Sequence, residues 1–90
     1  MTDFERVKVS RGERIVLQML DKKYKYLARD LSGYLFVYEE KPEKGRLCWY
    51  YSDEFYSLSA FNHHFQFVQW EDEEPWLIKD ILNKCGVKFE

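Results

Sequence analysis

The sequence predicts an α+β domain: an antiparallel sheet of three to four strands with an N-terminal and a C-terminal helix packed on it. Apolar residues follow helical spacing near each end of the chain, whereas the central segments alternate with the two-residue period of strands. The short connections between these central segments contain glycine and favour antiparallel neighbours. A chain of 90 residues predicts a single domain, residues 1–90.

The first helix is predicted over residues 11–23. Ser10 and Glu13 have the spacing of a capping box, in which each side chain bonds to the backbone amide of the other residue. Val16, Leu17 and Leu20 then recur at helical spacing. The nine residues that come first are interpreted as either a short edge strand or a frayed arm.

Three strands are predicted next, over residues 24–29, 34–39 and 46–51. Residues 30–33 form a turn in which Gly33 takes a positive φ, so the first two strands make a hairpin. Residues 41–45 form a second turn, with Pro42 early and Gly45 late.

Residues 55–61 fit either a short strand or one or two helical turns. Residues 64–70 alternate again and carry apolar side chains on both faces. This pattern predicts a central strand that is covered on both sides.

The last helix is predicted to begin near Pro75, because proline is favoured in a first helical turn. Its apolar stripe consists of Leu77, Ile78, Ile81, Leu82 and Cys85.

Four consecutive carboxylates, Glu71, Asp72, Glu73 and Glu74, stand directly before Pro75. One interpretation is that they complement the positive end of the helix dipole. The other is that they form an acidic surface for a partner. A metal site is the weakest interpretation, because the run lacks the alternating ligands and the glycine of a calcium loop.

The net charge of −2 conceals an uneven distribution. Residues 1–50 carry a formal charge of +3 and residues 51–90 carry −5. A protein that binds nucleic acid through phosphates usually shows a clear basic excess. The acidic C-terminal half therefore favours a basic protein partner.

Several classes of function lack the residues that they need. The four glycines are isolated, so no loop can cradle a phosphate, and no serine or cysteine lies in a recognisable catalytic motif. His63 and His64 are adjacent, so in a strand they would point to opposite faces and not chelate one ion. We therefore expect no enzymatic activity, no cofactor and no metal.

The cysteine pattern and the hydropathy predict where the protein works. Cys48 and Cys85 cannot form the multiple bridges of a small secreted domain, and we expect both thiols to be buried and reduced. No apolar run has the roughly 18 residues of a membrane helix, and the N-terminus does not resemble a secretory signal. We expect a cytoplasmic protein that contacts no membrane.

Aromatic residues make up 19% of the chain and concentrate in the predicted strands, beside basic residues. A sheet of this kind can stack the bases of single-stranded nucleic acid, or its rings can pair across strands and fill a small core. A chain this short can hardly bury every ring, so some should be exposed to a partner. The predicted contact residues are Tyr26, Tyr34, Tyr38, Trp49, Tyr50, Lys25 and Arg29.

Three strings, YKYLARD (residues 24–30), LFVYEEKP (35–42) and FQFVQWEDEEPW (65–76), together with Trp49, resemble small proteins encoded by phages and prophages of Gram-positive bacteria. The resemblance covers roughly residues 20–82, and it transfers no catalytic residues. It implies a phage-type accessory protein that binds a host or phage protein. One such role is to inhibit a nucleic-acid-processing enzyme of host defence, for example a CRISPR nuclease.

Two other functions stay open at this point. One is a module that binds single-stranded nucleic acid through the strand tyrosines and their basic neighbours. The other is a homodimer whose aromatic face pairs with itself.

Overall fold

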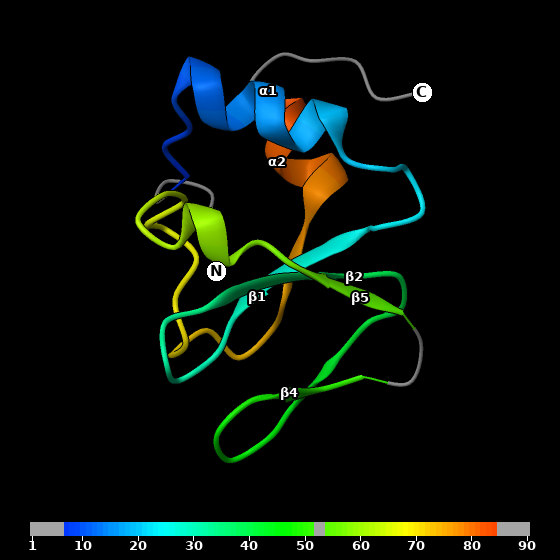
Figure 1. Cartoon of the computed structure of the whole chain (residues 1–90), viewed down its shortest axis with the longest axis vertical. Coiled ribbons are helices and arrows are strands. Elements are labelled where there is room, and N and C mark those ends of the chain that lie inside the picture. Colours follow the sequence, from blue (N-terminus) through cyan, green and yellow to red (C-terminus); the bar gives the residue numbers. More distant parts are fainter. Residues whose placement is uncertain (1–6, 52–53, 85–90) are drawn as a thin grey trace.

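The computed structural model describes residues 7–51 and 54–84, and it confirms the predicted α+β class. Figure 1 shows its elements. In chain order they are α1 (Arg11–Met19), β1 (Tyr26–Arg29), β2 (Leu35–Tyr38), β3 (Glu43–Lys44), β4 (Trp49–Tyr50), β5 (Phe55–Ser57), the 3₁₀ turn η2 (Ser59–Phe61), β6 (Trp76–Leu77) and α2 (Ile78–Lys84). Four strands form an antiparallel sheet with the order β5-β2-β1-β6.

The sheet is covered on both faces. Figure 1 shows α1 and α2 on one side of it and the small hairpin of β3 and β4 on the other. The two helices contact each other. In the part of the chain that the structure describes, neither helix has the length and apolar character that crossing a membrane requires.

Alternation along β1 and β2 sends side chains to two separate cores. Leu27 lies opposite Val37, and Ala28 lies opposite Phe36. The core on the helix side contains the buried residues Val7, Leu17, Leu27, Leu35, Val37, Leu58, Phe65, Phe67, Val68, Ile78, Ile81 and Leu82. The smaller core on the hairpin side contains Ala28, Tyr38 and Trp49, with Tyr26, Phe36 and Trp70 packed against it.

The capping box predicted at the start of α1 is present. Ser10 Oγ accepts a hydrogen bond from Glu13 N at 3.1 Å, and Glu13 Oε1 accepts one from Ser10 N at 3.0 Å. The helix ends at Met19 rather than at residue 23. A local turn replaces its last part, because the Asp21 carboxylate accepts a hydrogen bond from Lys23 N and Asp21 O accepts one from Tyr24 N.

The hairpin of β1 and β2 matches its prediction, and Gly33 has the expected positive φ of 95° in the turn. Residues 55–61 contain both alternatives, a short strand followed by a 3₁₀ turn. Residues 7–10 form no regular element, although the Val7 side chain is buried.

The prediction of a third sheet strand over residues 46–51 is wrong. Only Trp49 and Tyr50 are extended, and they pair with Lys44 and Glu43 in a separate two-stranded sheet. Glu43 and Lys44 were predicted to be part of a turn. The actual turn lies later, where Gly45 N donates to Cys48 O at 2.9 Å. This hairpin packs on the face of the main sheet because Trp49 is buried there, and β5 takes the place beside β2.

The prediction of a central strand over residues 64–70 is also wrong. The segment is a series of turns, and Phe65 has a φ of +56°, which no extended strand allows. A left-handed residue of this kind costs about 1–2 kcal/mol. Full burial of the Phe65 side chain contributes about 1.5–3 kcal/mol, so burial offsets the strain.

The last helix begins at Ile78 and not near Pro75. Trp76 and Leu77 instead form the edge strand β6, which pairs with Leu27 and Tyr26 of β1. The four carboxylates therefore do not lie in the first turn of α2, and the helix-dipole interpretation of them is wrong. Ile78, Ile81 and Leu82 are buried as predicted, whereas Leu77 is 39% exposed. Cys85 lies outside the described residues.

Candidate protein-binding surface

Arg29, predicted as a contact residue, instead donates hydrogen bonds to the backbone of several segments of the chain. Its Nε donates to Val68 O at 2.7 Å, and its guanidinium also donates to four further backbone carbonyls. These are Gly33 O at 2.7 Å, Asn62 O at 2.9 Å, His64 O at 2.9 Å and Phe65 O at 3.2 Å. Partial burial lowers the pKa of Arg29. Because these carbonyls occupy the guanidinium, it has little left to offer a partner.

Tyr38 and Trp49, also predicted as contact residues, are only 2% and 3% exposed. Burial raises the pKa of the Tyr38 phenol. Trp49 Nε1 donates to Arg29 O at 3.1 Å, and Trp49 N donates to the Asp30 carboxylate at 3.2 Å. Burial removes both rings from the predicted contact surface.

The other predicted aromatic and basic residues are more accessible. Tyr34 is 52% exposed and Tyr50 is 61% exposed. Lys25 is exposed, and Tyr26 is half-buried against the smaller core. Tyr34 belongs to the turn after β1, and Tyr50 belongs to the hairpin.

The four carboxylates of residues 71–74 have different environments. One oxygen of the Asp72 carboxylate accepts from Gln69 N at 3.0 Å and from Trp76 Nε1 at 2.9 Å, so Asp72 fixes the loop that leads into β6. Glu74 forms a salt bridge of 2.7 Å with Lys41. Glu71 and Glu73 are exposed and have no ion pair with the described residues.

Lys44 ties the hairpin to this acidic segment. Its Nζ donates to Trp70 O and to Asp72 O at 2.6 Å. The same ammonium lies 4.2 Å from the centre of the Trp70 ring and 5.2 Å from that of Trp49. The hairpin and residues 70–74 thus form one layer over the second face of the sheet.

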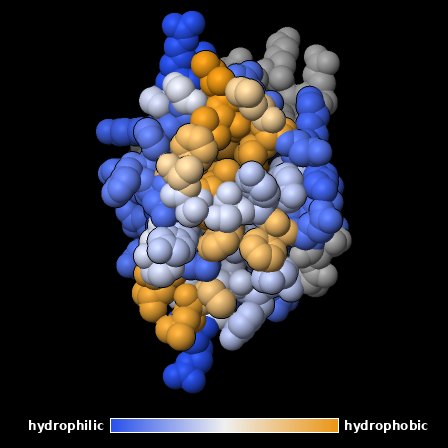
Figure 2. Space-filling model, viewed as in Figure 1, coloured by the Kyte–Doolittle hydropathy of each residue, from blue (hydrophilic) through white to orange (hydrophobic). Residues whose placement is uncertain are grey.

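Exposed apolar side chains gather on the outer side of this layer. We define the hairpin surface as Leu31, Leu47 and Tyr50, which are 52%, 68% and 61% exposed. Tyr51 is 51% exposed, but its ring packs against Phe55 of β5, with ring centres 4.3 Å apart. Leu31 N donates to Leu47 O at 3.3 Å, which brings the turn after β1 to the hairpin. Figure 2 shows hydrophobic side chains at the lower end of the molecule, where Figure 1 places the hairpin.

Sequence reasoning missed Leu31 and Leu47. Leu47 sits in a two-residue turn between paired strands, and a turn of that kind normally presents its side chains to water. A leucine at such a position was the available signal, but the turn was predicted over residues 41–45, whereas it lies at residues 45–48. A cavity of about 540 Å³ lies beside it, lined by Arg46, Leu47, Cys48 and Tyr50.

The layer around the hairpin surface is acidic. Residues 39–51 and 71–74 together carry seven carboxylates and three cations, a formal charge of −4. Two of those three cations have internal partners, since Lys41 pairs with Glu74 and Lys44 bonds to backbone carbonyls. Glu43 lies directly opposite Tyr50 in the hairpin, so a carboxylate borders the exposed ring.

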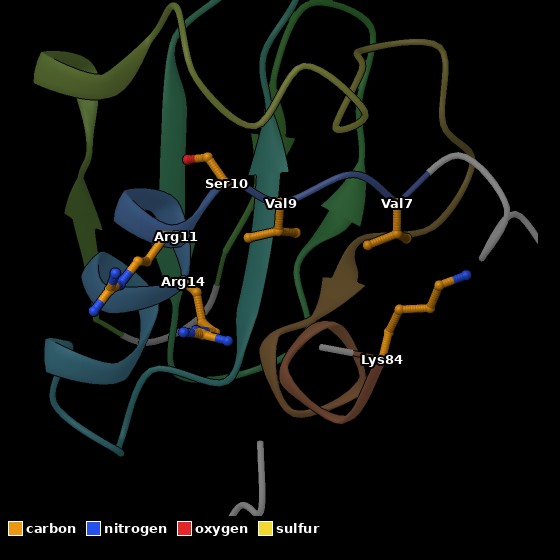
Figure 3. A pocket seen from close by; sticks show the side chains of 6 residues that line it. All are labelled: Val7, Val9, Ser10, Arg11, Arg14 and Lys84. Carbon is orange, nitrogen blue, oxygen red and sulfur yellow. The ribbon is translucent and has the colours of Figure 1, made fainter. Parts of the chain in front are cut away.

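A basic pocket of about 370 Å³ lies at the other end of the molecule, lined by Val7, Val9, Ser10, Arg11, Arg14 and Lys84. Figure 3 shows Lys84 extending from α2 toward Val7, whereas Arg11 and Arg14 extend on the opposite side of the pocket. Binding of a single phosphate requires cations that converge on one point, and the side chains of Arg11, Arg14 and Lys84 do not converge.

No cluster of three or more His, Cys, Asp or Glu side chains that could hold a metal ion occurs within residues 7–51 and 54–84. His64 Nδ1 lies 3.2 Å from the Glu13 carboxylate, and His63 is exposed. Cys48 is a free thiol, but it is half-buried and not buried as predicted.

Comparisons with protein-family models, with curated proteins and with solved structures find no match to this chain.

Proposed function

We propose that this protein is a non-enzymatic, phage-type accessory protein that binds another protein through the hairpin surface. One observation carries the proposal: Leu31, Leu47 and Tyr50 are more than half exposed and lie on one acidic layer. Large apolar side chains that meet on a surface and are bordered by polar groups are typical of protein-binding sites.

The hairpin presents Tyr50 in a fixed position, which favours binding. Trp49 is anchored in the smaller core, and its neighbour Tyr50 therefore points outward. A Cβ atom on Gly45 would lie 2.6 Å from the Tyr50 ring, so this ring rests directly on the glycine backbone. A ring that is already ordered loses less conformational entropy when a partner binds.

Charge defines the chemistry of the proposed partner. The acidic layer suits a protein that offers an apolar pocket with lysine or arginine at its rim. Host enzymes that process nucleic acids present basic grooves, and a CRISPR nuclease is one example. The resemblance of the strand and loop sequences to phage proteins supports the same class of partner.

The basic residues around the strands give less support to nucleic-acid binding. Lys41 and Lys23 pair with Glu74 and Glu54, and Arg29 and Lys44 bond to backbone carbonyls. Phosphate binding needs cations that are free to replace counterions. Lys25 and Arg46 are exposed, but they lie near opposite ends of β1 and do not form one basic patch.

Affinity capture with paired variants tests the proposal. Bacterial lysate is passed over the wild-type protein, over Leu47→Ser/Tyr50→Ser and over the control Ile15→Ser/Met19→Ser. The control removes two exposed apolar side chains, 43% and 80% exposed, from α1 on the other side of the sheet. Each protein retained by the wild type is then purified and titrated by calorimetry, alongside a titration with short single-stranded oligonucleotides.

We expect a purified protein to bind the wild type and the control with equal affinity. The hairpin variant should bind it at least about tenfold more weakly, because each interface anchor typically contributes 1–2 kcal/mol or more. Retention of the same proteins by all three columns would contradict the proposal. Tight oligonucleotide binding that weakens with salt would favour the nucleic-acid alternative.

A further inference from the structure

Strand β5 is an open edge of the four-stranded sheet. It pairs with β2 on one side only, and all three of its residues are exposed. The opposite edge strand, β6, has two residues, follows Pro75 and runs directly into α2. Proline and a short strand both discourage further pairing, so β5 is the edge that can accept another strand.

The hydrogen-bond register shows which backbone groups of β5 face outward. Leu58 N donates to Leu35 O, Glu39 N donates to Glu54 O, and Tyr56 lies opposite Val37 between them. Antiparallel strands alternate between pairs whose backbone groups bond to each other and pairs whose groups point away. The amide and carbonyl groups of Phe55 and Ser57 therefore point away from β2.

The β5 edge lacks the charged side chains and the proline that often keep sheet edges apart. Residues 55–62 contain no charged side chain and no proline. Phe55 and Tyr56 are 40% and 56% exposed and extend to opposite faces of the sheet. Two identical uncharged edges can pair without bringing like charges together. The same edge has no charged side chain that could attract a charged partner.

We propose that two copies of this chain pair through β5 and form a continuous eight-stranded antiparallel sheet. A two-fold axis at Tyr56 places Phe55 of each copy opposite Ser57 of the other. The outward amide and carbonyl groups of both residues then form four hydrogen bonds around the axis. The Tyr56 side chains meet on the helix side, where each already contacts Tyr24 of its own chain with ring centres 6.2 Å apart.

The dimer should be weak. A stable interface of standard size covers about 800 Å² per partner, which is about an eighth of the 6138 Å² surface of this chain. A three-residue strand with its flanking rings covers less than that area. We therefore expect dissociation in the micromolar range, and a concentration-dependent equilibrium rather than a permanent dimer.

Sedimentation equilibrium of the full chain from about 10 µM to about 1 mM tests the proposal. The wild type should shift from monomer toward dimer with rising concentration. Tyr56→Lys should stay monomeric, because two ammonium groups would meet at the axis, and its thermal unfolding should be unchanged because Tyr56 is more than half exposed. Tyr50→Lys, an equally exposed tyrosine on the hairpin surface, should dimerise like the wild type.

Cross-linking locates the axis independently. In an antiparallel pair without direct backbone bonds the Cα atoms lie about 4.5 Å apart, close enough for a disulfide. With Cys48 and Cys85 replaced by serine, Tyr56→Cys should oxidise to a covalent dimer at least about tenfold faster than Tyr50→Cys. A wild type that is monomeric at every concentration, or a dimer that Tyr56→Lys leaves intact, would overturn the proposal. Because the dimer interface and the hairpin surface are tested with different variants, either can fail without the other.

Discussion

At the residue scale, Arg29 joins the loop of residues 62–68 to the sheet. We expect Arg29→Lys to lower the free energy of unfolding by about 2–3 kcal/mol, because an ammonium cannot reach carbonyls spread around a planar guanidinium. Urea unfolding followed by tryptophan fluorescence measures the change. Arg46→Lys, at an exposed position in the hairpin turn, should change it by less than about 0.5 kcal/mol.

Glu13 gives stability a dependence on pH. Partial burial raises the pKa of Glu13, but hydrogen bonds from the amides of Phe65 and Ser10 and the contact with His64 outweigh it, so the pKa lies below its usual value. As the pH falls, the unfolded chain therefore takes up this proton before the folded chain does. The ionised Glu13 carboxylate therefore stabilises the folded protein at pH values above the usual pKa of a glutamate. This stabilisation is lost as the pH falls through the pKa of Glu13 in the folded state.

We expect Glu13→Gln to be less stable than the wild type at neutral pH, by about 1 kcal/mol, because the capping box and the bond to Phe65 weaken. This difference should shrink toward zero in acid. Urea titrations of both proteins between neutral and acidic pH measure it, with Glu40→Gln as an exposed control. A difference that is constant with pH would show that ionised Glu13 is not the source.

Glu13 and Arg29 show which side-chain contacts can be predicted from the sequence. The capping box was predictable because Ser10 and Glu13 are three positions apart and each side chain bonds to the backbone amide of the other residue. The acceptors of Arg29 in residues 62–68 are distant in the sequence, and they are carbonyls that every residue carries. Arg29 was therefore mistaken for a surface residue.

At the element scale, the β3–β4 hairpin depends on the absence of a side chain at Gly45. A Cβ atom there would lie 2.5 Å from Cys48 O and 2.6 Å from the Tyr50 ring. Because Cys48 O is backbone, the turn itself would have to move. We expect Gly45→Ala to destabilise the protein by about 1–3 kcal/mol and to displace Tyr50.

Gly12→Ala is the matched control, since nothing lies within 4 Å of a Cβ atom at that helical position. It should leave stability unchanged or raise it by up to about 1 kcal/mol. Thermal unfolding compares the two variants. Equal stability of both alanine variants would argue against the close contact between Gly45 and Tyr50.

The acidic segment separates into structural and exposed carboxylates. Asp72→Ala should lower the free energy of unfolding by about 1–3 kcal/mol, because Gln69 N and the Trp76 indole lose their acceptor. Glu73→Ala, at an exposed position one residue away, should have an effect below about 0.5 kcal/mol. Chemical unfolding of the two variants measures the contrast, and similar values would contradict these separate roles.

Helices and strands were predicted correctly where residues close together in the sequence carry all the signals of the element. The β1–β2 hairpin has alternation on both strands and a glycine in its turn. Residues 64–70 also alternate, and Phe65, Phe67 and Val68 are buried, yet tertiary contacts with Arg29 bend the segment into turns. Pro75 suggested a helix start, but pairing of Trp76 and Leu77 with β1 delays the helix to Ile78.

At the scale of the whole molecule, the aromatic residues divide between the core and the surface. Phe65 and Trp49 are buried on opposite faces of the sheet, whereas Tyr50, Tyr51 and Tyr56 are more than half exposed. The α+β class was predictable because segments with helical spacing near each end of the chain flank central segments that alternate with the two-residue period of strands. The strand order β5-β2-β1-β6 did not, because β1 and β6 are distant in the sequence and no local pattern specifies such a pairing.

Amide hydrogen exchange of the full chain, with and without the partner isolated by capture, tests the central claim most directly. Binding through the hairpin surface predicts new protection in residues 43–51 and at Leu31, with no change in α1. Protection that appears over α1 and leaves residues 43–51 unchanged would contradict the account.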